Sequence, residues 1–341
     1  MTCRKLGRTL IYGAGAVGLA LASCLLAAGE RRAILARPQT ARRLAQEGLL
    51  RTGLFGRAYA PPGRLDVVST LDDLPAAPVD CVLVCVKSYD SGAAARDLHA
   101  HGPLVGPRTR FVLFQNGWGN AQTFARFFPP QAIYNARVIT GFARPAPNRV
   151  EVTVHADAIH VGSLYGAGLA SVEGLCAAVA AGGIPCRTAP EIARDLWAKM
   201  LFNCPLNALG ALLGLPYGAL AESEHARPVM EAIVREVFAV MGAAGYASHW
   251  PTASDYLPVF YGTLVPRTAR HLSSTLQDLR AGKRTEIDAL NGAVVALGEA
   301  HHVPVPANRV VYHLIKQLES QGGKTDDGRR TTEHAGLNLD V

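Results

Sequence analysis

The feature that most constrains the fold of this chain is a glycine-rich turn near its start, Gly13-Ala14-Gly15-Ala16-Val17-Gly18. The turn follows the apolar run 9–12 and leads directly into the alanine- and leucine-rich run 19–28. This order of strand, turn and helix is the G-x-G-x-x-G arrangement that holds the pyrophosphate of a dinucleotide. The first glycine permits a tight turn, the second lets the backbone approach the phosphates, and the third brings the helix close to the strand. We therefore expect residues 13–18 to bind a dinucleotide cofactor.

The same segment has a second interpretation, as a secretory or lipoprotein signal. Basic residues precede an apolar run that ends in Leu21-Ala22-Ser23-Cys24. A signal has an uninterrupted apolar core, whereas here three glycines stand at the spacing of the dinucleotide turn. A second apolar strand, 32–36, follows at once. We therefore interpret the first residues as part of the folded protein.

Length and composition favour a two-domain globular protein. The chain has 341 residues, more than one hydrophobic core comfortably serves. We find no apolar run of the roughly eighteen residues that a membrane span needs. The seven cysteines include no C-x-x-C pair, and Cys81 and Cys85 lie in apolar strand-like sequence. We therefore expect reduced thiols in a cytoplasmic protein, without disulfides or a metal site.

The formal net charge of +7 raises the question of a nucleic-acid partner. The basic residues are dispersed along the chain, and aromatic residues make up only 7% of it, so no stacking platform for bases is evident. A mildly basic surface around a site for anionic ligands explains the charge equally well, and so does a merely solvated surface. We expect neither a nucleic-acid nor a membrane partner.

The residue at the end of the second strand bears on the choice of cofactor. A dinucleotide site specific for NAD usually places Asp or Glu there, to bind the ribose 2′-hydroxyl, but this chain has Arg37. A guanidinium favours a 2′-phosphate and hence NADP(H), with Arg42 and Arg43 as candidate helpers. The alternative is an ordinary solvated arginine at the end of a strand.

Further apolar runs predict the remaining strands of a parallel sheet. Continuous apolar runs are typical of parallel strands that are covered on both faces. The runs 79–87 and 111–114 lead to Lys87 and to Gln115-Asn116-Gly117, at the carboxyl edge where open α/β sheets bind ligands. Other expected strands are 65–69, 133–139, 150–155, 159–163 and 184–187, with a helix over 171–181.

At residue 188 the character of the sequence changes. Thr188-Ala189-Pro190-Glu191 has the spacing of a capping box, and the sequence from there to about residue 319 is typical of helices. We place an α/β Rossmann-type domain at 1–187 and an all-helical domain at 188–320. The tail 321–341 is rich in glycine and charge and lacks periodicity, so we expect it to be disordered.

Three polar residues are spaced four apart in the first helix of the helical domain: Lys199, Asn203 and Asn207. This spacing puts them on one helix face, among large apolar side chains, where buried polar groups need partners. The alternative is a lysine that reaches solvent, with asparagines that cap the helix locally near Pro205.

A second polar constellation comes later in the helical domain. Thr285-Glu286-Ile287-Asp288 is predicted to open a helix, with Glu286 in the first turn, where the helix dipole keeps a carboxylate ionised. An earlier polar segment begins with Ser273-Ser274 and ends with Asp278. Alternatively, Glu286 is an ordinary capping acid and the two serines are a helix N-terminus.

Taken in order, these motifs resemble the ketopantoate reductases over roughly residues 8–319. They are G-x-G-A-V-G, Val86-Lys87, Gln115-Asn116-Gly117, Leu196-Trp197-x-Lys199 with Asn203 and Asn207, Ser-Ser-x-Leu-Gln-Asp and Thr-Glu-Ile-Asp-x-Leu-Asn-Gly. The resemblance implies an NADPH-dependent enzyme with a Rossmann-type domain, a helical domain like that of 6-phosphogluconate dehydrogenases, and an active site between them. The implied reaction reduces a small 2-oxo acid, 2-dehydropantoate, to pantoate in pantothenate and coenzyme A biosynthesis.

The resemblance also implies roles for single residues. Lys199 would be the general acid that protonates the ketone oxygen, and Glu286 would hold the hydroxyl end of the substrate and interact with the lysine. The implied substrate-binding residues are Asn116, Asn203, Asn207 and Ser274. The implied cofactor-binding residues are Gly13, Ala14, Gly15, Ala16, Val17, Gly18, Arg37, Lys87 and Asn116.

Three positions depart from the family pattern on the substrate side. Tyr217 stands where members commonly carry asparagine, His271 where some carry asparagine, and Thr275 where methionine is usual. Such changes can redirect substrate choice. A related reductase of another 2-oxo acid is therefore one alternative, and a non-catalytic NADP(H)-binding sensor is another. The sequence leaves monomer and homodimer both open.

Overall fold

An eight-stranded sheet organises the first half of the chain. The computed structural model describes residues 7–29 and 32–322. The strand order is β12 (Cys186–Thr188), β11 (Ile159–Gly162), β8 (Ile133–Arg137), β7 (Val105–Leu113), β6 (Val79–Val84), β1 (Thr9–Tyr12), β2 (Arg32–Leu35) and β5 (Leu65–Val68). From β8 to β5 all neighbours are parallel, whereas β11 runs antiparallel to β8. This is the predicted α/β Rossmann-type architecture.

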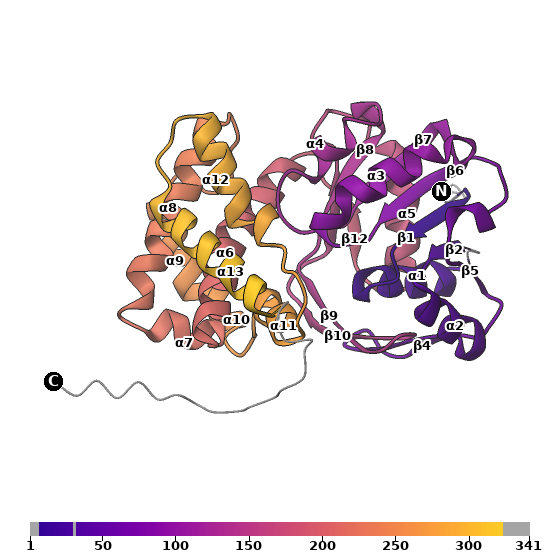
Figure 1. Cartoon of the computed structure of the whole chain (residues 1–341), viewed down its shortest axis with the longest axis horizontal. Helices are drawn as coiled ribbons and strands as arrows, with labels where there is room; N and C mark the ends of the chain where they lie inside the picture. Colours follow the sequence, from indigo (N-terminus) through magenta and orange to yellow (C-terminus); the bar gives the residue numbers. More distant parts are fainter. Residues whose placement is uncertain (1–6, 30–31, 323–341) are drawn as a thin grey trace.

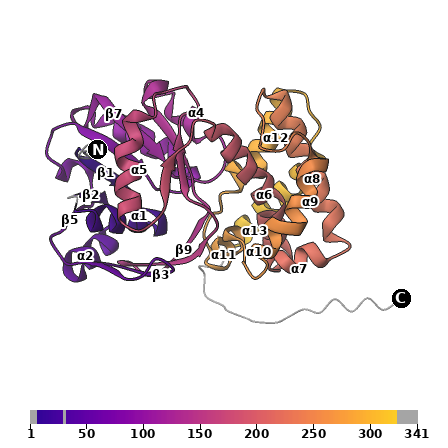
Figure 2. The same cartoon turned by 180° about the vertical axis from the view of Figure 1, so that it is seen from behind.

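Helices cover both faces of this sheet. Successive strand residues point to opposite sides, and the strands carry apolar side chains on both, so each face packs against helices. Ile11 and Leu83 pack in one apolar cluster with α1 (Ala16–Ala27) and α5 (Ala170–Ala181). Their neighbours Leu10 and Val82 belong to the opposite cluster, with α3 (Ser91–Ala100) and α4 (Asn120–Phe124). Figure 2 shows α1 and α5 side by side on the face turned toward the viewer.

A second, four-stranded sheet lies outside α1, in the order β4 (Ala58–Ala60), β3 (Leu49–Gly53), β10 (Arg149–His155) and β9 (Thr140–Ala146). Val150 and Val152 of β10 pack in the same cluster as α1. Figure 1 shows this sheet as a flat layer that runs from the neighbourhood of α11 to α2 (Pro38–Glu47). The sequence predicted only the strand 150–155 of this sheet, because β3 and β4 are short and interrupted by polar residues.

The helical domain is built around α6 (Ile192–Leu213), which contacts α8, α11 and α13. The other helices are α7 (Tyr217–Glu222), α8 (Ala226–Ala243), α9 (Ala253–Val259), α10 (Val265–Arg267), α11 (Ser274–Arg280), α12 (Asn291–Ala300) and α13 (Pro306–Gly322). Figure 1 shows them gathered at the end of the molecule opposite α2. The predicted all-helical C-terminal region is therefore confirmed.

The start of α6 differs from the prediction. Thr188 does not cap a helix, because it is the last residue of β12 and pairs with Val161 of β11. The helix begins at Ile192, after Glu191, whose side chain makes no capping bond. Strand pairing of the backbone therefore takes precedence over the local capping pattern. Pro205 lies inside α6, yet the helix continues to Leu213.

Two other predictions, on membrane spans and on the C-terminal tail, also differ from the structure. By length and composition α6 could cross a membrane, contrary to the expectation that no run is long enough, but 67% of its most apolar window is buried inside the protein. Core helices of soluble proteins pass the same test. The first two residues of the expected disordered tail, 321 and 322, belong to α13, which extends to Gly322. Residues 323–341 lie outside the described part of the chain.

Candidate active site

The glycine turn has the geometry that a bound pyrophosphate requires. Gly13 has a φ of +111°, which strains any residue with a side chain, and a Cβ on Gly18 would lie 2.0 Å from the carbonyl oxygen of Gly13. A Cβ on Gly15 would meet no protein atom closer than 3.7 Å. The protein itself therefore leaves open the space in front of Gly15, at the N-terminus of α1. This cradle fits a dinucleotide phosphate.

Arg37 stands where the sequence places it, at the carboxyl end of β2. It is the N-cap residue of α2, and its side chain is exposed. The backbone N–H of Gly13 donates to the carbonyl of Leu35 at 3.2 Å, which joins the glycine turn to the end of this strand. One of the two expected helpers, Arg43, forms an ion pair with Glu47 one turn further along α2.

Lys199 lies half-buried on α6, where the helix meets residues of the sheet domain. Its ammonium donates to the side-chain oxygen of Asn116 at 2.5 Å and to the carbonyl of Val138 at 2.6 Å. These contacts use two of the three N–H donors of the lysine. Burial lowers the pKa of Lys199 to about 8, although the charge of Glu286 acts in the opposite direction. The lysine therefore loses its proton more easily than a solvated lysine does.

Glu286 is buried, with 6% of its surface exposed, and its carboxylate accepts three hydrogen bonds. The backbone N–H of Ser88 donates to Oε1 at 3.0 Å, and Asn116 and Lys87 donate to Oε2 at 3.0 and 3.3 Å. Burial raises the pKa of Glu286, but the charge of Lys87 and these hydrogen bonds outweigh it, so the pKa lies below its usual value. The carboxylate is therefore ionised at neutral pH.

The predicted position of Glu286 in the first turn of an α-helix is wrong. Glu286 precedes a short 3₁₀ turn, Ile287–Ala289, and α12 begins only at Asn291. The segment is held instead by Thr285, whose N–H and hydroxyl donate to the Glu319 carboxylate at 2.7 and 2.6 Å. The Glu286 carboxylate is stabilised by Ser88, Asn116 and Lys87 of the sheet domain, not by a helix dipole.

Asn116 joins the two charged residues, because its oxygen accepts from Lys199 and its nitrogen donates to Glu286. The turn that carries it is packed tightly onto the helical domain. Gly117 has a φ of +82°, and a Cβ there would lie 2.2 Å from the carbonyl oxygen of Ala289. The N–H of Trp118 donates to the same carbonyl at 2.8 Å. Asn116 is therefore fixed by both domains.

Lys87 comes to the same group of polar residues from the loop after β6. Its ammonium lies 2.7 Å from Oδ2 of Asp278 and 3.3 Å from Oε2 of Glu286. Burial lowers the pKa of Lys87, but the two carboxylates outweigh burial and raise it. Lys87 thus remains charged and offsets the buried charge of Glu286.

The other predicted substrate-binding residues lie on α6 and α11. Asn203 and Asn207 follow Lys199 on one face of α6, and the Asn207 oxygen accepts from the Tyr217 hydroxyl at 2.6 Å. Ser274 begins α11 and shares a helix face with Asp278, four residues later. The preceding residue, Ser273, caps α11 by accepting from the N–H of Leu276 at 3.0 Å.

Sequence reasoning missed several partners at this site. Asp278 stands inside a motif that was recognised, but its pairing with Lys87 has no sequence signal because 191 residues separate the two. The carbonyl of Val138 and the N–H of Ser88 are backbone groups, which no residue type marks.

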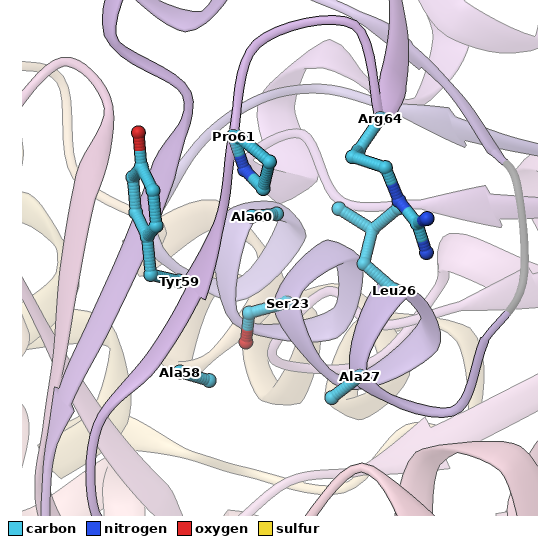
Figure 3. A pocket seen from close by; sticks show the side chains of 8 residues that line it. All are labelled: Ser23, Leu26, Ala27, Ala58, Tyr59, Ala60, Pro61 and Arg64. Carbon is cyan, nitrogen blue, oxygen red and sulfur yellow. The ribbon is translucent and has the colours of Figure 1, made fainter.

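A surface hollow of about 170 Å³ between α1 and β4, lined by Ser23, Tyr59 and Arg64 among others, lies at the opposite end of α1 from the glycine turn (Figure 3).

These features together define the class of protein. A glycine turn that fits a dinucleotide phosphate lies in a Rossmann-type sheet domain, and a linked lysine, amide and carboxylate join this domain to the helical one. This is a pyridine-nucleotide-dependent oxidoreductase. The family model for ketopantoate reductase PanE/ApbA matches residues 9–166, and the model for its C-terminal part matches residues 191–319. The chain belongs to the ketopantoate reductase family.

Individual relatives agree with this assignment along nearly the whole chain. A 2-dehydropantoate 2-reductase of Aquifex aeolicus is 33% identical over 311 residues, which cover 91% of this chain and 96% of that protein. The enzyme of the same name from Halobacterium salinarum is 31% identical over 322 residues, covering 92% and 100%.

Solved structures confirm the fold. A PanE/ApbA family ketopantoate reductase from Ralstonia eutropha has a TM-score of 0.79 and 32% identity, and the match covers 92% of this chain and 99% of that one. A D-mandelate dehydrogenase in complex with NADH and anilino(oxo)acetate has a TM-score of 0.81 at 20% identity, over 92% and 99%. At that identity the second similarity concerns the fold alone.

Proposed function

We propose that this chain reduces 2-dehydropantoate to pantoate where its sheet domain meets its helical domain, with NADPH as reductant. Relatives above 30% identity that carry the name 2-dehydropantoate 2-reductase support the reaction. The observation that carries the chemistry is the chain of contacts from Lys199 through Asn116 to Glu286. A protein that only sensed NADP(H) would need the glycine turn but not this arrangement.

The nicotinamide cofactor, when bound, supplies the hydride that adds to the carbonyl carbon of the 2-oxo acid. Negative charge then develops on the carbonyl oxygen. We assign Lys199 to this oxygen, because its third N–H is available for a substrate and its lowered pKa eases proton release. Asn116 and the carbonyl of Val138 hold the ammonium in place during the transfer.

We assign Glu286 to the hydroxyl end of the substrate. The ionised carboxylate can accept a hydrogen bond from an alcohol, and its buried charge raises the pKa of Lys199. Asn203, Asn207 and Ser274 would complete the substrate-binding wall. Since the Tyr217 hydroxyl already occupies the oxygen of Asn207, this asparagine would present its N–H₂ group to the substrate.

The pH dependence of the reaction follows from the role of Lys199. Only the protonated lysine can donate a proton, so we expect kcat/KM for reduction to fall as pH rises through about 8. Below that pH this group is protonated and does not limit the rate. Measuring kcat/KM for reduction from pH 6 to 10 checks this, and a profile that stays flat to pH 10 would contradict it.

The choice of NADP(H) rests on Arg37, which the structure leaves exposed at the end of β2. We expect Arg37→Ala to weaken binding of NADPH while leaving that of NADH nearly unchanged, because the guanidinium would contact only the 2′-phosphate. Titrating both cofactors into wild-type and variant protein tests this. Unchanged selectivity would assign Arg37 to the solvated surface.

The proposed reaction is tested by following NADPH oxidation at 340 nm with 2-dehydropantoate and a panel of other 2-oxo acids. Turnover of 2-dehydropantoate well above that of the panel supports the proposal. Tyr217 and His271 favour the alternative of another 2-oxo acid, because their ring centroids lie 5.2 Å apart and the Tyr217 hydroxyl bonds to Asn207, a proposed substrate-binding residue. A different best substrate would establish that alternative. Cytoplasmic localisation stays a prediction, and monomer and homodimer both stay open.

A further inference from the structure

Arg144 reaches from the small sheet to the nucleotide side of the large one. It lies on β9, at the surface, and its Nη2 donates to the Thr40 hydroxyl at 2.6 Å and to the carbonyl of Pro147 at 3.0 Å. Thr40 belongs to the first turn of α2, whose N-cap residue is Arg37. The contact therefore brings two arginines, separated by more than a hundred residues in sequence, to the same end of one helix.

The charges around this pair are unbalanced. Burial lowers the pKa of Arg144, and the positive charge of Arg37 lowers it further. The first turn of α2 contains no acidic residue. Glu47 lies at the far end of α2, where it pairs with Arg43 and accepts from Asn148. Two guanidinium groups of like charge repel one another, and an anion bound between them would relieve that repulsion.

The position of the pair relative to the cofactor cradle indicates which anion it would take. β2 is the neighbour of β1, and a backbone hydrogen bond links Gly13 to Leu35, two residues before Arg37. In the Rossmann arrangement, the end of this strand faces the adenosine ribose of the nucleotide. A phosphate on the ribose 2′-position would therefore enter the space that the two arginines border.

We propose that Arg144 is a second binding residue for the 2′-phosphate of NADP(H), acting together with Arg37. This inference rests on the proposed preference for NADP(H). The guanidinium supplies N–H donors to the phosphate oxygens, and Thr40 holds its Nη2 edge in place. Arg144 would thus join Arg37 in the helper role for which the sequence offered Arg42 and Arg43, of which Arg43 forms an ion pair with Glu47.

The test uses nucleotide fragments, so that it does not depend on catalysis. Adenosine 2′,5′-bisphosphate and adenosine 5′-monophosphate are titrated calorimetrically into wild-type protein and the variants Arg144→Ala and Arg144→Lys. We expect Arg144→Ala to lower affinity for the bisphosphate by about tenfold or more, with the monophosphate nearly unchanged, and Arg144→Lys to retain part of the affinity. Arg108→Ala is the matched control, since Arg108 is exposed near the amino end of β7, at the opposite edge of the sheet.

The outcomes separate this inference from the proposed function. If wild-type protein binds both fragments equally well, the preference for NADP(H) itself fails. If wild-type protein discriminates and Arg144→Ala discriminates equally, the role of Arg144 is overturned while that of Arg37 stands. If Arg144→Ala weakens both fragments alike and lowers the unfolding temperature, Arg144 only anchors β9 on α2, which also overturns the inference.

Discussion

Replacing Lys199 by alanine is expected to lower kcat for 2-dehydropantoate by at least about a hundredfold, while the Kd for NADPH stays nearly unchanged. The variant removes the proposed proton donor and the group that stabilises charge on the carbonyl oxygen. Lys199 contacts Asn116 and Val138, whereas the pyrophosphate cradle lies at the glycine turn. Steady-state kinetics and a fluorescence titration with NADPH measure the two effects separately.

Lys283→Ala is the control for the Lys199 experiment. Lys283 is exposed in the same domain, so its loss removes the same charge without touching the proposed proton donor. We expect its kcat to remain within about twofold of wild type, as is usual for surface substitutions. An active Lys199→Ala enzyme, with kcat close to that of the control, would remove Lys199 from the mechanism.

The second large effect is expected for Glu286→Gln, with a fall in kcat/KM of at least about a hundredfold. In the wild-type protein Lys87 and Asn116 donate to Oε2 of Glu286. In the variant an N–H₂ group takes the place of this acceptor, and a buried negative charge is lost. Because the charge of Glu286 raises the pKa of Lys199, its loss lowers that pKa further below 8. The alkaline fall in activity should therefore move to lower pH.

The pH profile distinguishes this role from a merely structural one. A variant that was only less stable would lose activity without moving the alkaline limb of kcat/KM. Glu224→Gln provides the control, since Glu224 is a highly exposed carboxylate in the same domain. A profile for Glu286→Gln with the wild-type alkaline limb would show that Glu286 does not act on the proton donor.

Much of the fold is predictable because its signals are local. The glycine turn, the apolar runs and the helical C-terminal region each depend on neighbouring residues, and the structure has them close to their predicted bounds. The small sheet was mostly missed, since β3 and β4 are three to five residues long and gain stability from packing on α1. Thr188 was misassigned because a capping pattern looks the same when its residues belong to a strand.

The candidate site divides in the same way. The face that carries Lys199, Asn203 and Asn207 follows from helix periodicity, so the sequence suffices for it. What holds the charge of Glu286 could not be predicted, because Lys87 and Ser88 lie almost two hundred residues away in sequence. The sequence suggested a helix dipole, whereas the structure uses direct donors from the other domain.

The tight contact between Gly117 and the carbonyl of Ala289 has a mechanical consequence. The Asn116 turn belongs to the sheet domain and Glu286 to the helical domain, yet no space separates the two segments. The contact therefore fixes the Asn116 turn against the segment that carries Glu286. A side chain at Gly117 would collide with the Ala289 carbonyl and push the two segments apart, so the Asn116 amide would lose the spacing at which it donates to the Glu286 carboxylate.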